Sequence, residues 1–410
     1  MGPVLRRASR AAASVESWMS PRVLSSPKRP GFVTPLCCHE SCEAQRTYYR
    51  ESMSLPGQSS LFEEDPMLAA LRAQARVCGP LGSKMYETLF TELADDYEAG
   101  GRIYALLAGR SARPIHDAVP LRLAGAIHRV VLRGEDDRLA RHYPSVGGKP
   151  GEDFGADFIG YVREHLDEVE SGLASQVQTN EVGRSVVQLT LSHWLTKFGV
   201  EEFDFFEVGA SAGLNLNFDK FYGCFGQLRM GDPTSELRFM GDWFGNAPLV
   251  PKTGARVVNC KGVDVSPIDV TDPSQEIRLL SFVWPDQKTR LQRIRAAIEI
   301  AKEHKPIVDT ESADTWIERQ LRAHRDKATV VFHSIVWQYL GPDVQRRFRQ
   351  ALEDASITAT PEKPLIWARM EPAGKVADVR VAMWRGGDPE EFLLAEIGYH
   401  GQEMNWLLPY

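Results

Sequence analysis

The spacing of apolar residues changes along the chain and divides it into three parts. Residues 59–175 carry apolar side chains at helical spacing, as Leu68 and Leu71 do, and this periodicity predicts a helical N-terminal domain. Beyond it, short apolar runs bounded by turn residues predict buried strands that alternate with helices. We therefore predict an α/β domain over residues 176–410, preceded by the helical domain and by a tail of residues 1–58.

The apolar runs of the α/β domain predict a sheet that is mostly parallel and closes with an antiparallel C-terminal hairpin. The strands are expected near residues 203–208, 256–258, 305–308, 328–335, 365–371, 376–384 and 391–397. The segment Arg385–Pro389, which reads RGGDP, is a strong turn signal between the last two strands.

Helix signals support the assignment of the first domain. Ser83 is expected to cap the helix that follows it. Ala118–Leu132 predicts a buried helix, and we interpret its His128 as a core histidine with satisfied hydrogen bonds. Two more helices are expected near 157–172 and 179–198.

The α/β domain is organised around residues 203–219, which read FDFFEVGASAGLNLNFD. A strand is expected to end at Glu207, a run of small residues extends from Gly209 to Gly213, and a helix is expected to follow. Small residues let backbone N–H groups approach a ligand, and a helix N-terminus adds a positive dipole. We expect the segment that begins at Asn180 to lie near this turn.

These letters resemble the first motif of class I S-adenosylmethionine-dependent methyltransferases, E/D-x-G-x-G-x-G, with Ser211 in place of the middle glycine. The resemblance implies a Rossmann-like methyltransferase-type sheet and S-adenosylmethionine as the cofactor. It assigns Glu207, Gly209, Ser211, Gly213 and Asn215 to cofactor binding.

Two other functions fit the same stretch. The letters GASAG also match G-x-S-x-G, the nucleophile elbow of α/β-hydrolases, which makes Ser211 a candidate nucleophile of an ester hydrolase and His400 its partner. Those hydrolases need several strands before the elbow, whereas helical patterns precede it here. The remaining alternative is a non-catalytic ligand-binding or scaffold protein.

A carboxylate at the end of the second strand should bind ribose hydroxyls, as in Rossmann-type sites. Asp264 and Asp269 are the candidates, and Asp264 lies 55 residues beyond Gly209. The usual gap is about 20 residues. We interpret Phe221–Gly254 as an inserted lid or substrate loop that accounts for the difference.

The methyltransferase resemblance also implies an acid near the third strand that contacts the adenine amino group. Asp309, Glu311 and Asp314 compete for this role, and Asp314 enters our predicted cofactor site.

The remaining predicted site residues belong to the acceptor. Trp284 and Asp286, in the turn WPDQ, are assigned to substrate binding, although Asp286 also suits the cap of the next helix. The strand ATVVFHSI ends at His333, and the resemblance implies that this end faces the transferred methyl group. His333 is therefore the candidate general base, with Gln338 and Tyr339 orienting the substrate; a hydrogen-bonded core histidine is the alternative.

Composition and charge narrow the classes of molecule that could be partners of this protein. The formal net charge of −7 argues against a general nucleic-acid binder, and no long apolar run predicts a membrane span. The acceptor is thus an unidentified small molecule or macromolecule. Scattered cysteines such as Cys78, Cys224 and Cys260 indicate thiols in a reducing compartment, and we expect a cytoplasmic protein.

The tail is basic, rich in Ala, Ser and Pro, and predicted to be disordered. It resembles an organellar transit peptide, while a start at Met53 explains it equally well. Its Cys37, Cys38, His39 and Cys42 follow no zinc-ligand spacing, so no metal site is predicted.

A wider resemblance covers residues 61–410. The segments that carry it read LRLAGAIHRVVLRG, YPSVGG, EVGASAGLNL, VSPIDV, WPDQ and HSIVWQYL. In this order they resemble the bacterial domain of unknown function 2332 family. The resemblance implies a soluble bacterial protein with a methyltransferase-like core, and it implies no established activity.

Overall fold

The computed structural model describes residues 65–241, 253–323 and 325–408. The predicted tail and its Cys37–Cys42 group lie outside the described residues. Among the residues described, no helix combines the length and the apolar character needed to cross a bilayer.

The N-terminal region is helical, as predicted. Its helices are α2 (Pro66–Cys78), α3 (Lys84–Glu98), α4 (Arg102–Leu107), α5 (Val119–Arg133), α6 (Asp137–Ala140), η1 (Pro144–Val146), α7 (Phe154–Glu164) and α8 (Leu166–Leu173). Buried residues from these helices form one hydrophobic core, which Trp284 joins from the other region. Ser83 caps α3 by accepting the N–H of Tyr86, which confirms the predicted cap.

His128 of α5 is the satisfied core histidine that the sequence predicts. Its Nδ1 lies 3.0 Å from the carbonyl oxygen of Ser281, and its Nε2 lies 2.8 Å from the Ser145 hydroxyl. Burial lowers the pKa of His128 to about 4, so the ring is neutral at physiological pH.

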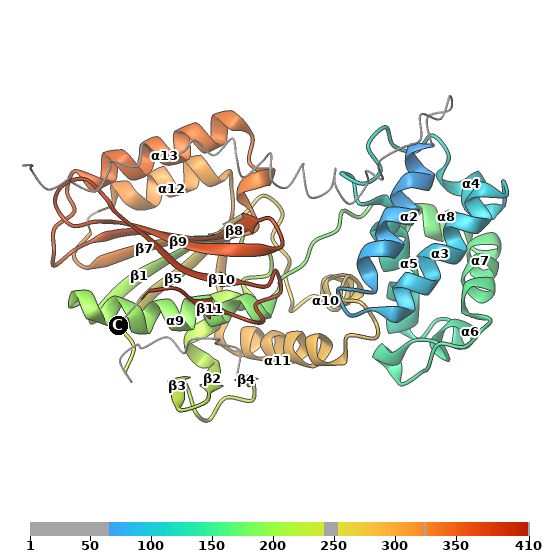
Figure 1. The fold of residues 1–410 in the computed structure, drawn as a ribbon, viewed down its shortest axis with the longest axis horizontal. Helices are drawn as coiled ribbons and strands as arrows, with labels where there is room; N and C mark the ends of the chain where they lie inside the picture. Colours follow the sequence, from blue (N-terminus) through green and yellow to red (C-terminus); the bar gives the residue numbers. More distant parts are fainter. Residues whose placement is uncertain (1–64, 242–252, 324, 409–410) are drawn as a thin grey trace, which may run out of the picture. The chain divides into compact units, whose positions relative to one another are not determined.

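The second region is a mixed α/β structure built on an eight-stranded sheet (Figure 1). Its strands are β1 (Glu202–Val208), β5 (Arg256–Asp264), β6 (Ile307–Thr310), β7 (Ala328–Ser334), β8 (Leu365–Ala373), β9 (Val376–Trp384), β10 (Glu390–Ile397) and β11 (Asn405–Trp406). The order across the sheet is β11-β10-β9-β8-β7-β1-β5-β6. All seven predicted strands are present.

Five neighbouring strands, β6, β5, β1, β7 and β8, are parallel. In chain order they are the third, second, first, fourth and fifth strands, so the direction of winding reverses between β1 and β7. The predicted C-terminal hairpin β9–β10 is confirmed. Strand β9 also pairs directly with β8, so the sheet ends in an antiparallel meander.

Helices cover both faces of the sheet (Figure 1). One face carries Phe206, Val208 and Val331 and packs against α12 (Ala313–Arg322) and α13 (Pro342–Ser356). The other face carries Phe203 and Phe205. It packs against η2 (Val182–Arg184), α9 (Ser185–Leu195), η3 (Thr196–Phe198), η4 (Leu214–Lys220), α10 (Pro273–Ser281) and α11 (Lys288–His304). The short helix η5 (Trp337–Tyr339) follows β7.

The structure adds detail to two predictions for the segment after β1. The predicted helix is the 3₁₀-helix η4, which has a kink at Asn217. The described part of the predicted insertion at Phe221–Gly254 forms a small sheet of β2 (Tyr222–Phe225), β3 (Leu228–Gly231) and β4 (Arg238–Met240) in the order β3-β2-β4.

The turn WPDQ joins the two regions. Asp286 accepts hydrogen bonds from the Ser83 hydroxyl at 2.6 Å and from the backbone N–H of Met85 at 3.1 Å. It therefore caps α3 and does not cap α11, where we expected it. Trp284 packs against Tyr86 in the helical core. These contacts give both residues a structural role that needs no ligand.

Candidate functional site

The small-residue turn after β1 lies at the carboxyl edge of the sheet, beside the point where the winding reverses. Its backbone is left-handed at Gly209, Ser211 and Gly213, with φ values of 72°, 55° and 69°. For a serine this conformation is uncommon and strained, and such strain concentrates at functional sites. Asp264, at the end of β5, holds the turn by accepting the Ser211 N–H at 2.9 Å.

Both glycines are required by close protein contacts. A Cβ on Gly209 would lie 2.2 Å from Cγ2 of Val336, in the segment after β7. A Cβ on Gly213 would lie 2.7 Å from Cγ2 of Val308 and 3.2 Å from Pro306. The space beside Gly213, which we assigned to a ligand, is therefore filled by the segment that leads into β6.

The N-terminus of η4 is closed by side chains. Asn180 accepts the backbone N–H of Leu214 at 3.0 Å, so that N–H is not offered to a ligand, and the predicted proximity of Asn180 to the turn is confirmed. The predicted cofactor residue Asn215 binds the Ser185 hydroxyl at 2.9 Å and the carbonyl oxygen of Glu181 at 3.3 Å.

Glu207 is the most unusual acid of the site. It is 2% exposed, and Oε2 has no hydrogen-bond partner among the described residues. Oε1 meets only the amide of Gln188, at 3.4 Å, and the carbonyl oxygen of that amide also lacks a partner. Burial raises the pKa of Glu207 to about 8, against the opposing effect of Arg184 and with support from the charge of Asp264.

The end of β5 and the residues after it lie beside the small-residue turn, at the carboxyl edge of the sheet. Besides the Ser211 N–H, Asp264 accepts the N–H of Ser266 at 2.9 Å. Val265, between them, is 77% exposed, and sequence reasoning missed it because one apolar residue in a turn carries no periodic signal. Asp269 instead caps its own turn by accepting from Thr271. Asp264 is thus the acid nearest the turn.

A group of charged residues lies near the same edge of the sheet. Glu181 forms an ion pair with Arg290 at 2.5 Å and contacts His400 Nδ1 at 3.1 Å. Burial would raise the pKa of Glu181, but Arg290, His400 and Arg184 together hold it well below its usual range. Arg184 donates to the carbonyl oxygens of Tyr399 and Ser334, and so ties the C-terminal turn to the end of β7.

His333, the predicted base, is 1% exposed at the end of β7. Its Nδ1 lies 2.6 Å from Oε1 of Glu371 on β8, and Nε2 has no partner among the described residues. The ring stacks on Trp337 with centroids 5.3 Å apart and also contacts Trp367. Glu371 was missed because its partner lies 38 residues away and no local spacing reveals the pair.

The structure does not bring every predicted site residue to this edge. Gln338 and Tyr339 follow His333, and Tyr339 is 74% exposed. Asp314 is buried at the start of α12, where it binds Ser312 and pairs with Arg347 of α13. Asp309 accepts the indole N–H of Trp316 at 2.6 Å. The contacts of Asp314 join two helices and leave a direct ligand role as a prediction only.

Two cavities have none of the turn residues 209–213 in their lining. One, of about 240 Å³, is in the helical region and is lined by Arg110, Ser111, Asp117, Val119, Arg122, Glu170, Leu173 and Ala174. The other, of about 10 Å³, is bordered by Asn180, Glu181 and Arg290 and has room for about one water molecule.

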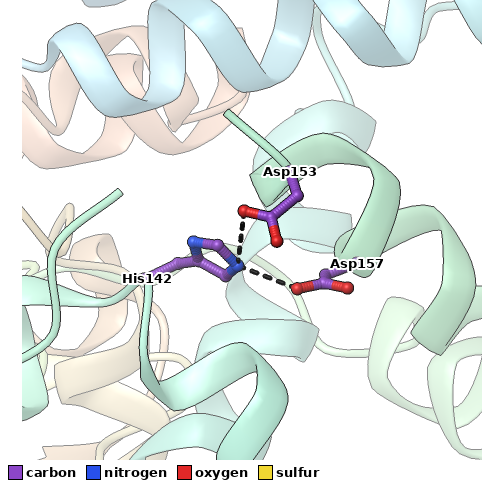
Figure 2. A group of neighbouring side chains, drawn as sticks. All are labelled: His142, Asp153 and Asp157. Atoms are coloured by element: carbon purple, nitrogen blue, oxygen red, sulfur yellow. Dashed lines mark hydrogen bonds and ion pairs between the residues drawn. The ribbon is translucent and has the colours of Figure 1, made fainter. Parts of the chain in front are cut away.

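A separate group in the helical region has the composition of a metal site. His142, Asp153 and Asp157 place one ligand atom each within 4.8 Å of one another. Figure 2 shows the two carboxylates converging on Nε2 of His142, at 3.9 Å from Asp153 and 2.9 Å from Asp157.

The neighbours of this group favour a structural role. The backbone N–H of Gly151 donates to Nδ1 of His142 at 3.1 Å, and Nε2 faces both Asp157, at 2.9 Å, and the Nε–H of Arg141, at 3.2 Å. Both ring nitrogens are thus already engaged by protein groups. The guanidinium of Arg141 already pairs with both carboxylates. The group therefore clamps the Pro/Gly-rich loop before α7.

Comparison with known proteins adds a family and no activity. A family model described as an uncharacterized protein conserved in bacteria (DUF2332) matches residues 68–406. No curated protein and no solved structure matches the chain.

Proposed function

The chain belongs to this family of uncharacterized bacterial proteins, and we propose that it binds S-adenosylmethionine at the turn after β1 and transfers the methyl group to an acceptor at the end of β7. Glu207 carries the proposal. A buried carboxyl with an unpartnered oxygen is costly unless a donor or a cation meets it. S-adenosylmethionine has both a sulfonium and an ammonium group.

The turn also discriminates between nucleotide-type ligands. A dinucleotide places its pyrophosphate on the free N–H groups of a helix N-terminus. Here the first such N–H is taken by Asn180, and the carboxyl of Glu207 adds negative charge when it ionises. Both features disfavour a pyrophosphate and suit a ligand that carries positive charge and no phosphate.

The sheet supplies further support. The order third-second-first-fourth-fifth matches the parallel part of Rossmann-type sheets, in which ligands bind outside the carboxyl ends at the switch point. Asp264 has lone pairs left to accept ribose hydroxyls, and the exposed side chain of Val265 offers an apolar surface to a planar base. Beyond these five strands, the antiparallel strand β9 pairs with β8.

Isothermal titration calorimetry tests the proposal directly. S-adenosylmethionine and S-adenosylhomocysteine should bind the full chain, whereas NAD should not. At a ligand concentration a hundred times the dissociation constant, the melting curve should show about 2.7 kcal/mol of stabilisation. Binding of NAD in preference to both adenosyl ligands, or binding of none of them, contradicts the proposal.

Ester hydrolysis is a second candidate that one observation favours. Ser211 occupies a strained turn between a strand and a helix, and its hydroxyl has no hydrogen-bond partner among the described residues. A serine hydrolase also needs a base within hydrogen-bond reach of that hydroxyl. His400 instead contacts Glu181, and His333 contacts Glu371. A fluorophosphonate probe separates the two functions, because only a hydrolase is labelled at Ser211 and loses the label in Ser211→Ala.

A further inference from the structure

One carboxylate oxygen organises the end of β7. Oε1 of Glu371 accepts from Nδ1 of His333 at 2.6 Å and from the backbone N–H groups of Val336 and Trp337 at 3.1 and 3.2 Å. Because a carboxylate only accepts and two of the three contacts come from fixed N–H donors, the ring nitrogen that faces it must carry the proton. His333 is then left with Nε2 as its lone-pair nitrogen when it is neutral.

That lone pair is buried and unused. Nε2 has no hydrogen-bond partner among the described residues, and the surroundings of the ring are Trp337, Trp367 and Phe348. An unpaired acceptor in such surroundings is unfavourable unless another molecule supplies a donor. The aromatic walls favour a neutral N–H or O–H group on an apolar or aromatic molecule, because a charged group would lose its hydration there.

The segment after β7 packs on the His333 ring through the stacked side chain of Trp337. It begins with Ile335, a β-branched residue at a φ of 53°, which is a strained conformation. It ends near Tyr339, which is 74% exposed, so the segment ends at the surface. The N–H of Ile335 donates to the carbonyl oxygen of Met370, and Glu371 is the side chain that accepts the next two N–H groups, those of Val336 and Trp337.

We propose that Glu371 is the positioning residue that makes Nε2 of His333 a proton acceptor for a neutral N–H or O–H group of the methyl acceptor, behind a cover formed by Ile335–Tyr339. The methyl-transfer reaction in this proposal rests on the proposed function. The assignment of the proton to Nδ1 of His333 rests on the geometry alone. The acceptor's lone pair forms the bond to the methyl carbon, the electrons of the broken carbon–sulfur bond stay on sulfur, and the acceptor's proton moves to Nε2.

The charged groups nearest to His333 come from several elements. Glu371 belongs to β8, as does Arg369, which lies over the Trp367 ring at 4.3 Å. Arg349 of α13 lies over the Trp337 ring at 5.0 Å, and Arg184 donates to the carbonyl oxygen of Ser334. Among these charged groups only Glu371 touches the imidazole, so its replacement should change the tautomer most.

Nitrogen NMR of ¹⁵N-histidine-labelled protein at neutral pH tests this assignment without any ligand. The His333 signals are identified by their loss in His333→Gln. We expect a protonated Nδ1 and an unprotonated Nε2 in the wild type. Glu371→Gln should keep this tautomer, because its amide oxygen still accepts, and Glu371→Ala should lose it. Glu391→Ala is the matched control, since Glu391 pairs with Arg369 on the same sheet and should leave the spectrum unchanged.

A proton on Nε2 in the wild type overturns the proposal, and so does an unchanged tautomer in Glu371→Ala.

Acylation by diethylpyrocarbonate, followed by mass spectrometry, tests the cover. His333 should react at least tenfold more slowly than the exposed His116, and Glu371→Ala should remove most of that protection. Equal rates at the two histidines in the wild type contradict the cover. If the tautomer is as expected and S-adenosylmethionine does not bind, the reaction fails while the assignment of His333 stands.

Discussion

Buried histidines in the helical region and at the carboxyl edge of the sheet differ in how their nitrogens are used. His128 and His142 have both ring nitrogens bonded, to Ser281 and Ser145 and to Gly151 and Asp157. His333 has one nitrogen bonded and the other buried without a partner among the described residues. A buried polar group that is fully bonded holds a fold together, whereas the open nitrogen of His333 is, in our proposal, the place for another molecule.

Glu207 extends the comparison to carboxyl groups. Asp286 in the turn WPDQ accepts two hydrogen bonds that join the regions. Glu207 receives only one long contact and has a raised pKa. Glu207 and His333 thus lie at the ends of β1 and β7, the two strands between which the winding reverses. Other buried atoms without a partner among the described residues, such as the hydroxyls of Tyr86 and Tyr143, lie in the helical region.

The largest expected effect concerns Glu207→Gln and pH. The folded protein holds the Glu207 proton up to about pH 8, whereas the unfolded chain releases it near 4.5. Wild-type stability should therefore fall as pH rises between these values, by as much as about 5 kcal/mol relative to the variant. Urea unfolding of both proteins at several pH values measures this difference. Parallel stability curves would show that Glu207 is not a buried, unpaired acid.

His128→Leu tests a buried histidine whose two ring nitrogens are both hydrogen-bonded. The substitution keeps the volume similar but leaves the Ser281 carbonyl and the Ser145 hydroxyl without their buried partner. We expect a loss of about 3 kcal/mol in the free energy of unfolding and no change in ligand affinity. His116→Leu, at an exposed position of the same region, should change stability by less than about 0.5 kcal/mol. Equal effects would remove the distinction between the two kinds of histidine.

Gly209→Ala measures the contact between the ends of β1 and β7. Its new methyl would meet Val336 at 2.2 Å, in a left-handed backbone. Gly199 has a similar φ of 76° and no atom within 4 Å of its Cβ position. Gly199→Ala therefore measures the loss of stability that comes from placing an alanine in a left-handed backbone, without a steric contact. We expect Gly209→Ala to destabilise the protein by about 2 kcal/mol more than Gly199→Ala. The same loss in both variants would mean that Val336 does not press on the turn.

The smallest effect is expected at His142. Because both ring nitrogens of His142 already meet protein groups and Arg141 neutralises the carboxylates, zinc or manganese should leave the melting temperature unchanged. Thermal unfolding with each ion and with a chelator measures this. A metal-dependent rise of several degrees in the melting temperature would show that His142, Asp153 and Asp157 bind a metal ion, which contradicts the structural role given to them here.

Local signals were enough to predict the sheet and much of the site. Strands such as β1 and β7 are continuous apolar runs, and the turn RGGDP separates β9 from β10, so the order of elements follows from the chain. The turn after β1 was found from its small residues. The small sheet of β2, β3 and β4 was missed because strands of three or four residues are too short to show a period.

Contacts between distant residues could not be predicted. Asp286 lies 203 residues from Ser83, and no local pattern separates this cap from a cap on the next helix. The helix expected at Leu214 is a 3₁₀-helix whose first N–H is taken by Asn180, 34 residues earlier. Glu371 stands in a predicted strand, yet its importance follows only from its contact with His333.

Proton release on ligand binding tests the central claim most directly. Calorimetric titration of the protein with S-adenosylmethionine at pH 7, in two buffers with different ionisation enthalpies, counts the protons exchanged. If Glu207, with its pKa of about 8, ionises to meet the cation, close to one proton should be released by the wild type and almost none by Glu207→Gln. Binding with no proton release, or with the same release in both proteins, would contradict the account.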